Sequence, residues 1–411
     1  MAAESQPPWI TREFLEKILQ KECRDPDVSV TKYDISTATP KGGGYLSTLY
    51  RVVVEYTRNN GHPVKLSLVI KSQPEDIYQL DFSKKVRAFI KEETMYQKIL
   101  PAMKILALRM KSNIPLMTFA PKYFECPKQD TLVLEDLKES GFKLVDRRKR
   151  LDFDHSLLVV RKLAEFHATS IALHHEDGSY MESFSEGHYT QIMYDGVKSF
   201  FNQTFDALIC NLEKWGGFER SISKLEKLSE KATDIMMEQI RPRDGGIVVL
   251  NHGDVWVNNL MFKYSRDGQV EDVRFFDFQL ARFTSPAIEL HFFFCLSIQE
   301  EVLFHKFYDL IEEYYLVLSE KLECYKCDPN LVSLLKLKKE MKNTAEFAVI
   351  TTCSKLWFVL VNPDHVDDVV FLDKFSRGEG TFNPLVKVYS DPLIRKTFEN
   401  LLPYFEKRGY L

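Results

Sequence analysis

The chain has 411 residues, of which 45% are hydrophobic and 28% are charged. This composition is that of a globular protein and excludes a disordered or fibrous chain, and the length suffices for two lobes with separate cores. Lysine and arginine number 55 against 59 aspartates and glutamates, which gives a net charge of −4. A balance this close to neutral provides no field suited to nucleic acid or an anionic membrane, so we expect neither as a partner.

Seven cysteines are scattered from Cys23 to Cys353. An odd number at irregular spacing does not form a disulfide framework and fits a reducing compartment. The N-terminal residues are neither cationic nor apolar enough for a signal peptide, and apolar runs such as 356–361 are far shorter than the roughly 20 residues that span a bilayer. We therefore expect a soluble, cytoplasmic protein.

The N-terminal part of the chain predicts a short helix, a glycine turn and two strands. Thr11 is a candidate N-cap, and the helical face that follows it is apolar. Gly42, Gly43 and Gly44 directly precede a β-branched strand, and a second strand ends at Lys71. Glycines at such a turn let the backbone approach a phosphate closely, although the run by itself also fits a flexible hairpin turn.

The next predicted helix runs roughly from Asp81 to Leu100 and carries two adjacent acids, Glu92 and Glu93. Steps of 100° per residue place Glu93 inside the apolar stripe of this helix and Glu92 at its edge. Periodicity therefore favours Glu93 as the acid that faces inward. Either acid can also be a solvated surface charge.

Beyond this helix, residues 131–137 form an apolar strand that ends in acids. A long helix is predicted over 153–173, with His167 on its apolar face. Residues 189–241 read as a mostly helical segment of mixed charge, longer than a simple connection needs. From residue 291 onward helical periodicity dominates, so this C-terminal part of the chain is expected to be mainly helical.

Two loops that each follow a strand-like run offer polar side chains. Asp254 and Asn259 follow the first run, and Asp277 follows the second. An aspartate at the first loop can accept the proton of an attacking hydroxyl, and an asparagine five positions later can ligate a metal. The second aspartate can bridge this metal to a triphosphate. The paired motifs predict a phosphoryl-transfer site, although His-Gly-Asp alone also fits an ordinary turn.

The spacing from Asp254 to Asn259 is that of the protein-kinase catalytic loop, but Gly253 replaces its arginine and Gln279 replaces the glycine of Asp-Phe-Gly. These changes point away from protein substrates. His-Gly-Asp with a later Asp-Phe-Gln resembles the small-molecule kinases of the choline kinase and aminoglycoside phosphotransferase type. Within them, residues 251–259, with a tryptophan and two adjacent asparagines, resemble the insect ecdysteroid kinase-like (CHK kinase-like) family. The resemblance extends along nearly the whole chain.

The resemblance implies an α+β, two-lobed protein-kinase-like fold. Residues 1–136 would form a small nucleotide-binding lobe with an antiparallel sheet and one key helix. Residues 137–411 would form a larger, mainly helical lobe that holds the catalytic residues and binds the acceptor. The hinge between the two lobes would lie at about 132–137.

The resemblance also implies which residues bind ATP. Lys71 ends a Val-Ile-Lys motif in the place of the phosphate-pairing lysine, and Gly42 to Gly44 would cover the phosphates. The family pattern Phe-x-x-Glu-x-x-x-Tyr selects Glu92 as the ion-pair partner of Lys71. We predict Glu92 for this reason, against the preference of the helical periodicity for Glu93.

In the hinge, backbone groups and apolar side chains would hold the adenine of ATP, which assigns Leu134, Glu135 and Leu137 to the cofactor site. His167 is expected to be a core histidine that braces the catalytic loop. Glu289 stands where the family usually has aspartate. This departure places the local geometry in question, because the longer acid must reach the same partners.

We therefore predict an ATP- and Mg²⁺-dependent phosphotransferase that acts on a hydroxyl of a small molecule. Asp254 would position and deprotonate the hydroxyl, and Asn259 and Asp277 would hold Mg²⁺. The resemblance suggests an ecdysteroid or another lipophilic alcohol, including plant or xenobiotic compounds, as the acceptor. No obligate protein partner is implied.

Two alternatives stay open. A choline-, ethanolamine- or aminoglycoside-type kinase would keep the chemistry, but its cationic acceptor needs acids and aromatic faces in the pocket. A catalytically inactive nucleotide-binding protein would keep only the binding site. The complete set of one lysine, two aspartates and one asparagine argues against the inactive protein, because a scaffold has no physical need for all four.

Overall fold

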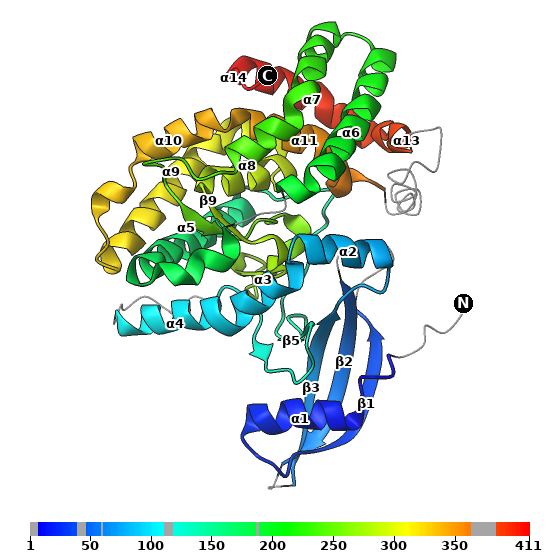
Figure 1. Ribbon diagram of the computed structural model, residues 1–411, viewed down its shortest axis with the longest axis vertical. Coiled ribbons are helices and arrows are strands. Elements are labelled where there is room, and N and C mark those ends of the chain that lie inside the picture. The colour runs from blue at the N-terminus through cyan, green and yellow to red at the C-terminus, as the bar shows by residue number, and fades with distance from the viewer. Residues whose placement is uncertain (1–6, 39–46, 59–60, 111–117, 186–188, 363–383) are drawn as a thin grey trace.

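The computed structural model describes residues 7–38, 47–58, 61–110, 118–185, 189–362 and 384–411. Gly42, Gly43 and Gly44, the predicted phosphate-covering turn, lie outside the described residues. Figure 1 shows a sheet-bearing lobe at the N-terminal end and a larger helical lobe at the C-terminal end. This arrangement confirms the predicted α+β fold class with a small antiparallel sheet and a mainly helical second part.

The N-terminal lobe is built on a five-stranded antiparallel sheet with strand order β1-β2-β3-β5-β4. Its strands are β1 (Ser29–Thr37), β2 (Thr48–Thr57), β3 (Pro63–Ser72), β4 (Tyr123–Phe124) and β5 (Thr131–Glu135). Helix α1 (Arg12–Cys23) begins after Thr11, whose side chain accepts a hydrogen bond from the Phe14 amide. The buried stripe of this helix packs against the sheet residues Val52 and Val54, as its periodicity predicts.

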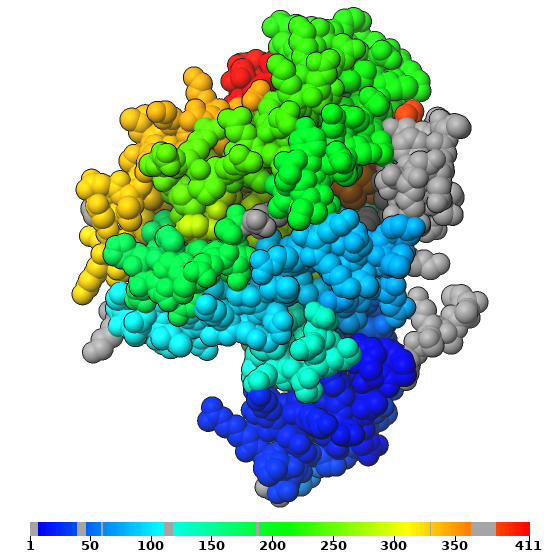
Figure 2. All heavy atoms as spheres, in the orientation of Figure 1, coloured from blue at the N-terminus to red at the C-terminus, as the bar shows by residue number. Residues whose placement is uncertain are grey.

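The single helix predicted over 81–100 is wrong. The chain forms four shorter segments: α2 (Ile77–Lys85), α3 (Ala88–Thr94), the π-helical turn η1 (Met95–Ile99) and α4 (Leu100–Arg109). Arg87, with a φ of 56°, has a left-handed backbone that separates α2 from α3. Pro101 lacks an amide hydrogen, and directly before it the Leu100 amide bonds the carbonyl of Met95, five residues back. Figure 2 shows these helices, in light blue to cyan, between the dark blue N-terminal strands and the helical lobe.

The C-terminal lobe is mainly helical. Its helices are α5 (Phe153–Glu176), α6 (Tyr194–Trp215), α7 (Glu219–Gln239), α8 (Pro286–Ser297), α9 (Glu300–Cys324), α10 (Leu334–Asn343), α11 (Ala345–Leu360), α13 (Leu385–Tyr389) and α14 (Pro392–Arg408). Two short antiparallel pairs lie among them: β6 (Val249–Asn251) with β9 (Arg282–Thr284), and β7 (Leu260–Tyr264) with β8 (Val270–Phe275). These two pairs carry the loops of the predicted site.

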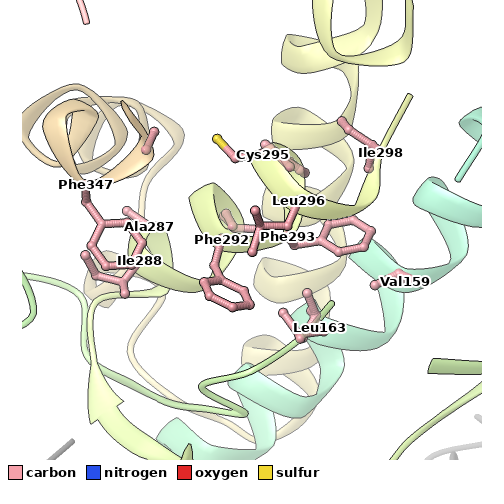
Figure 3. Close-up of a cluster of buried hydrophobic side chains, with 14 of the residues drawn as sticks. Val159, Leu163, Ala287, Ile288, Phe292, Phe293, Cys295, Leu296, Ile298 and Phe347 are labelled. Carbon is pink, nitrogen blue, oxygen red and sulfur yellow. The ribbon is translucent and has the colours of Figure 1, made fainter. Parts of the chain in front are cut away.

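Helix α8 lies at the centre of this lobe. Every one of its residues is buried, which is the pattern of a helix surrounded on all sides. Figure 3 shows its side chains Phe292 and Phe293 among residues of α5 such as Leu163, with Phe347 of α11 on the other side. The phenylalanine side chains of α8 therefore belong to the core of this lobe.

Strand β5 ends at Glu135, one residue before the predicted lobe boundary. The carboxylate of Asp136 accepts hydrogen bonds from Arg51 Nε at 2.6 Å and Ser67 Oγ at 2.8 Å, both on the N-terminal sheet. Burial opposes the charge on Asp136, but these two bonds outweigh it and its pKa is lowered. By its contacts Asp136 belongs to the N-terminal lobe, which is compatible with the boundary proposed at 136/137.

No helix among the described residues combines the length and apolar character needed to cross a membrane. All seven cysteines are free thiols.

Candidate active site

The two polar loops predicted from the sequence meet in the structure. The Asn259 side-chain amide donates hydrogen bonds to the backbone carbonyl and to Oδ2 of Asp254, each at 2.9 Å. The Phe276 amide donates to the Asn259 carbonyl at 3.2 Å, so the loop after β8 is tied to the loop after β6. Because the amide nitrogen of Asn259 serves Asp254, its amide oxygen is left to face another ligand.

Lys71 joins three elements at the start of the second loop. Its Nζ lies 2.8 Å from Asp277 Oδ1 and 2.6 Å from Glu92 Oε2. The side chain of Lys71 is 4% exposed and that of Glu92 is fully buried. This buried cluster connects strand β3, helix α3 and the loop that follows β8, which places the predicted phosphate-pairing lysine beside the predicted metal-binding aspartate.

Lys71 pairs with Glu92, the acid selected by the family pattern, and not with Glu93. Glu93 instead accepts a hydrogen bond from Gln97 at 2.9 Å on the exposed side of the helix. The periodicity favoured the wrong acid because it assumed one unbroken helix from residue 81. The left-handed residue Arg87 resets the phase, so the stripe that begins in α2 does not continue into α3.

Burial opposes the charges of Lys71 and Glu92. It disfavours the charge on Lys71, but the carboxylates of Asp277 and Glu92 outweigh it, so the pKa of Lys71 is raised. Burial raises the pKa of Glu92 to about 7, with Lys71 opposing and Asp277 adding to the shift. Lys71 is therefore held as an ammonium group between two acids, the form in which it can bind phosphate.

Asp254 has an unusual carboxyl group. Burial and the charge of Asp277 raise its pKa to about 7, while Lys355, the hydrogen bond from Asn259 and Arg282 act in the opposite direction. A carboxyl that titrates near neutral pH is suited to accept a proton during a reaction. The sequence did not predict Lys355 or Arg282 as neighbours of this group. Arg282 lies five residues after Asp277, but nothing in the sequence around Lys355 indicates the site.

Glu289 braces the catalytic loop from behind. Its carboxylate accepts the amide hydrogens of His252 at 2.9 Å and Gly253 at 2.7 Å. His167 Nε2 lies 2.9 Å from the same carboxylate, and His167 Nδ1 lies 2.7 Å from the Tyr314 hydroxyl. The longer acid thus makes loop-bracing bonds, and His167 is the buried core histidine that the sequence predicted.

Gly253 is required where protein kinases have arginine. Its φ is 84°, and a Cβ atom built on it would lie 1.9 Å from the carbonyl oxygen of Leu280. Any side chain here would collide with the backbone of the second loop. His252, the residue before Gly253, donates a hydrogen bond from Nε2 to the Phe276 carbonyl at 3.0 Å. Burial lowers the pKa of His252, so it acts as a neutral structural histidine.

The hinge residues differ in what their backbones offer to a ligand. Leu134 pairs with both β3 and β4 inside the sheet, and the Glu135 amide donates to the Lys122 carbonyl at 2.8 Å. The Leu137 carbonyl accepts from the Phe142 amide at 3.0 Å. Across the part of the chain that the structure describes, the Leu137 amide donates to no protein group. Among the residues that the structure describes, Leu137 is the predicted hinge residue whose backbone amide has no acceptor.

The described residues contain no cluster of three or more His, Cys, Asp or Glu side chains arranged to hold a metal ion. Mg²⁺ does not need one, because it prefers oxygen ligands and is usually held by one or two carboxylates together with substrate phosphates. Asp277, with its side chain 32% exposed, and the amide oxygen of Asn259 form such a partial set. The donor chemistry of these two residues fits Mg²⁺.

A family model described as the ecdysteroid kinase-like family matches residues 41–327. The chain belongs to this family. The match includes the lysine and glutamate of the N-terminal lobe and both polar loops, and it leaves the residues before 41 and after 327 outside. No curated protein matches the chain. Membership in the ecdysteroid kinase-like family indicates a small-molecule kinase-like phosphotransferase.

Proposed function

We propose that this protein transfers the γ-phosphoryl group of Mg²⁺-bound ATP to a hydroxyl of a small molecule. The observation that carries the proposal is the ion-pair cluster of Lys71, Glu92 and Asp277, next to the hydrogen-bonded pair of Asp254 and Asn259. Together these five side chains are the functional set of a phosphoryl-transfer site. An inactive binding protein would have no need of Asp254 and its near-neutral pKa.

In the proposed reaction the protein positions groups and stabilises charge, and it forms no covalent intermediate. The acceptor oxygen bonds to the γ-phosphorus while the bond from that phosphorus to the β–γ bridging oxygen breaks. The hydroxyl proton passes to Asp254. Lys71, oriented by Glu92, would bind the α- and β-phosphates. Asn259 and Asp277 would hold Mg²⁺, which neutralises triphosphate charge when bound.

We assign the adenine site to the hinge. The free amide of Leu137 can donate to the purine, whereas the Glu135 amide is already used within the sheet. Leu134 would contribute its buried side chain and the strand that carries the hinge. The glycines at 42–44 are proposed, from the sequence alone, to cover the phosphates. Residues 1–136 and 137–411 would form the nucleotide lobe and the catalytic lobe.

We propose a lipophilic alcohol, such as an ecdysteroid or a xenobiotic, as the acceptor, on the basis of the family. A choline-, ethanolamine- or aminoglycoside-type acceptor is disfavoured. Those molecules are cations, and the positive charges of Lys355 and Arg282, which act on Asp254, would repel them. The seven free thiols support a cytoplasmic location.

The test is a screen of purified protein with labelled ATP and Mg²⁺ against panels of steroids, phenols, glycosides and amino alcohols. We expect label transfer to at least one neutral or acidic alcohol and none with the Asp254→Asn variant. Calorimetry of Mg²⁺-ATP binding accompanies the screen. A protein that neither binds Mg²⁺-ATP nor labels any acceptor would contradict the proposal.

A further inference from the structure

Two cations beside Asp254 have no ionic partner among the described residues. Arg282 is 3% exposed, and its Nε and Nη1 atoms are buried without a hydrogen-bond acceptor. Lys355 is half-buried and forms no ion pair with any residue that the structure describes. A buried guanidinium is almost always paired in proteins, so this arrangement needs an explanation.

The two cations come from different elements and meet over one aromatic ring. Arg282 begins β9 and lies opposite Asn251 in β6, the residue that starts the catalytic motif. Lys355 projects from α11. The Arg282 Cζ atom lies 6.0 Å from the ring centroid of Tyr189, and Lys355 Nζ lies 5.5 Å from the same centroid. The positive charges of both cations act on the carboxyl group of Asp254 and oppose the rise of its pKa.

The contacts that Arg282 makes within the protein do not offset the free-energy cost of burying its charge. Burying an unpaired charged group costs more free energy than a cation–π contact returns. Glu289 is an anion near Arg282, but its carboxylate already binds His167 and two loop amides. Burial lowers the pKa of Arg282, with Tyr189, Glu289 and Asp254 opposing. Two donors of the guanidinium remain available for a ligand.

We infer that Arg282 and Lys355 form an oxyanion-binding site on the acceptor side of Asp254. The unpaired N–H groups of Arg282 can each donate a charge-assisted hydrogen bond to an oxygen of a phosphate or carboxylate, and Lys355 adds a second positive charge. Within the described residues neither cation forms a hydrogen bond or ion pair with Asn259 or Asp277, the proposed Mg²⁺ ligands. The inference rests on the proposed function.

This site compensates for a feature of the catalytic loop. The residues between Asp254 and Asn259 are Val-Trp-Val-Asn, none of which is basic. A phosphoryl group that arrives next to the carboxylate of Asp254 would meet like charge unless a cation is near. Arg282 and Lys355 supply this positive charge from outside the loop.

Two sources can deliver the oxyanion. The first is the transferred phosphoryl group itself, once it is esterified to the acceptor. The second is an acid group on the acceptor, such as a carboxylate, sulfate or phosphate, at a distance from the reacting hydroxyl. The two cations would bind either oxyanion by the same chemistry. One arm of the experiment therefore tests whether the site binds an oxyanion, and the other tests which of the two sources supplies it.

The first arm measures binding without turnover. Inorganic phosphate is titrated into the protein by calorimetry, with Mg²⁺ and a non-hydrolysable ATP analogue present to occupy the triphosphate site. We expect Lys355→Gln and Arg282→Gln each to weaken phosphate binding at least about tenfold, since each removes a charged hydrogen-bonding partner. Lys396→Gln, which removes an exposed lysine of α14, serves as the charge-matched control and should bind like wild type.

Because Arg282 is buried, circular dichroism must show that Arg282→Gln is folded, and Lys355→Gln carries the test alone if it is not. Unchanged phosphate affinity in a folded Lys355→Gln variant would overturn the inference. This arm does not depend on catalysis. The protein could bind phosphate through Arg282 and Lys355 and still phosphorylate no acceptor. This result would support the oxyanion-binding site and contradict the proposed function.

The second arm compares acceptors by steady-state kinetics in the same variants. A fall in kcat for neutral and acidic acceptors alike, with KM unchanged, identifies the transferred phosphoryl group as the source. A rise in KM confined to acidic acceptors, with neutral alcohols unaffected, identifies the acid group of the acceptor. If both variants phosphorylate every acceptor with wild-type kinetics, the inferred oxyanion-binding site is contradicted.

Discussion

At the scale of single residues, the chemistry depends on one carboxyl group whose surroundings oppose its charge. Asp254 is half-buried, and desolvation of its carboxyl group together with the charge of Asp277 raises its pKa to about 7. We expect Asp254→Asn to lower phosphotransfer by on the order of 10²-fold or more, as for the loss of a positioned proton acceptor. Mg²⁺-ATP affinity, measured by calorimetry, should stay near wild type. Turnover close to wild type would show that another group takes the proton.

The same pKa predicts a pH dependence of activity and of stability. Asp254 must be ionised to accept a proton, so kcat/KM should rise with pH and level off above about 7. Its pKa is raised from an ordinary value of 3.8, so the unfolded chain loses this proton first and folding stability falls as pH rises from about 4 to 7. The Asp254→Asn variant has no ionisable carboxyl group at this position, so it does not lose this part of the folding stability as the pH rises. Thermal melts at pH 5 and pH 8 should therefore show the variant gaining in Tm relative to wild type at the higher pH.

Alanine substitutions at Gly253 and Gly268 separate the cost of a left-handed backbone from the cost of a steric clash. Both have left-handed backbones, with φ of 84° and 85°. A Cβ on Gly268 would meet nothing within 4 Å, whereas one on Gly253 would lie 1.9 Å from the Leu280 carbonyl. We expect Gly268→Ala to cost about 1 kcal/mol for the left-handed backbone alone, and Gly253→Ala to cost clearly more and to lower activity. Equal urea-unfolding free energies for the two variants would contradict this assignment.

At the scale of elements, helix α3 acts through one acid on strand β3. We expect Lys71→Met and Glu92→Gln each to reduce activity strongly. The double variant should cost far less than the two losses combined, because either change already breaks the ion pair. Glu93→Gln is the control on the neighbouring position, which lies on the outer side of the helix and should change little. A double-mutant cycle on ATP turnover with additive losses at Glu92 would remove the proposed role of this pair.

At the scale of the whole molecule, Asp277 connects the two lobes. Its contact with Lys71 joins residues 206 positions apart, from the sheet of the first lobe to a loop of the second. Asp277→Ala would remove both this contact and a proposed Mg²⁺ ligand. We expect Mg²⁺-dependent ATP binding and activity to fall together. Calorimetry is the measurement, and an unchanged affinity for Mg²⁺-ATP would contradict the metal-binding role.

Local patterns in the sequence determined several elements correctly. The cap at Thr11 and the apolar stripe after it predict α1, because a helix start and a 3.6-residue period depend only on nearby residues. The paired motifs around Asp254 and Asp277 predict the two loops for the same reason, since each motif is read within one stretch of chain. Together with the family pattern they were sufficient to predict the α+β fold class.

Tertiary structure decided the points at which distant residues meet. Glu92 faces Lys71 because Arg87 breaks the helix and resets its phase, which periodicity over an assumed single helix could not show. Arg282 of β9 and Lys355 of α11 both lie near the ring of Tyr189 and act on Asp254 because of how β9 and α11 pack in the fold. The sequence by itself determined which groups are present for chemistry. The fold alone determined which charges surround the reacting carboxyl, because burial and Coulomb interactions depend on distances in space and not along the chain.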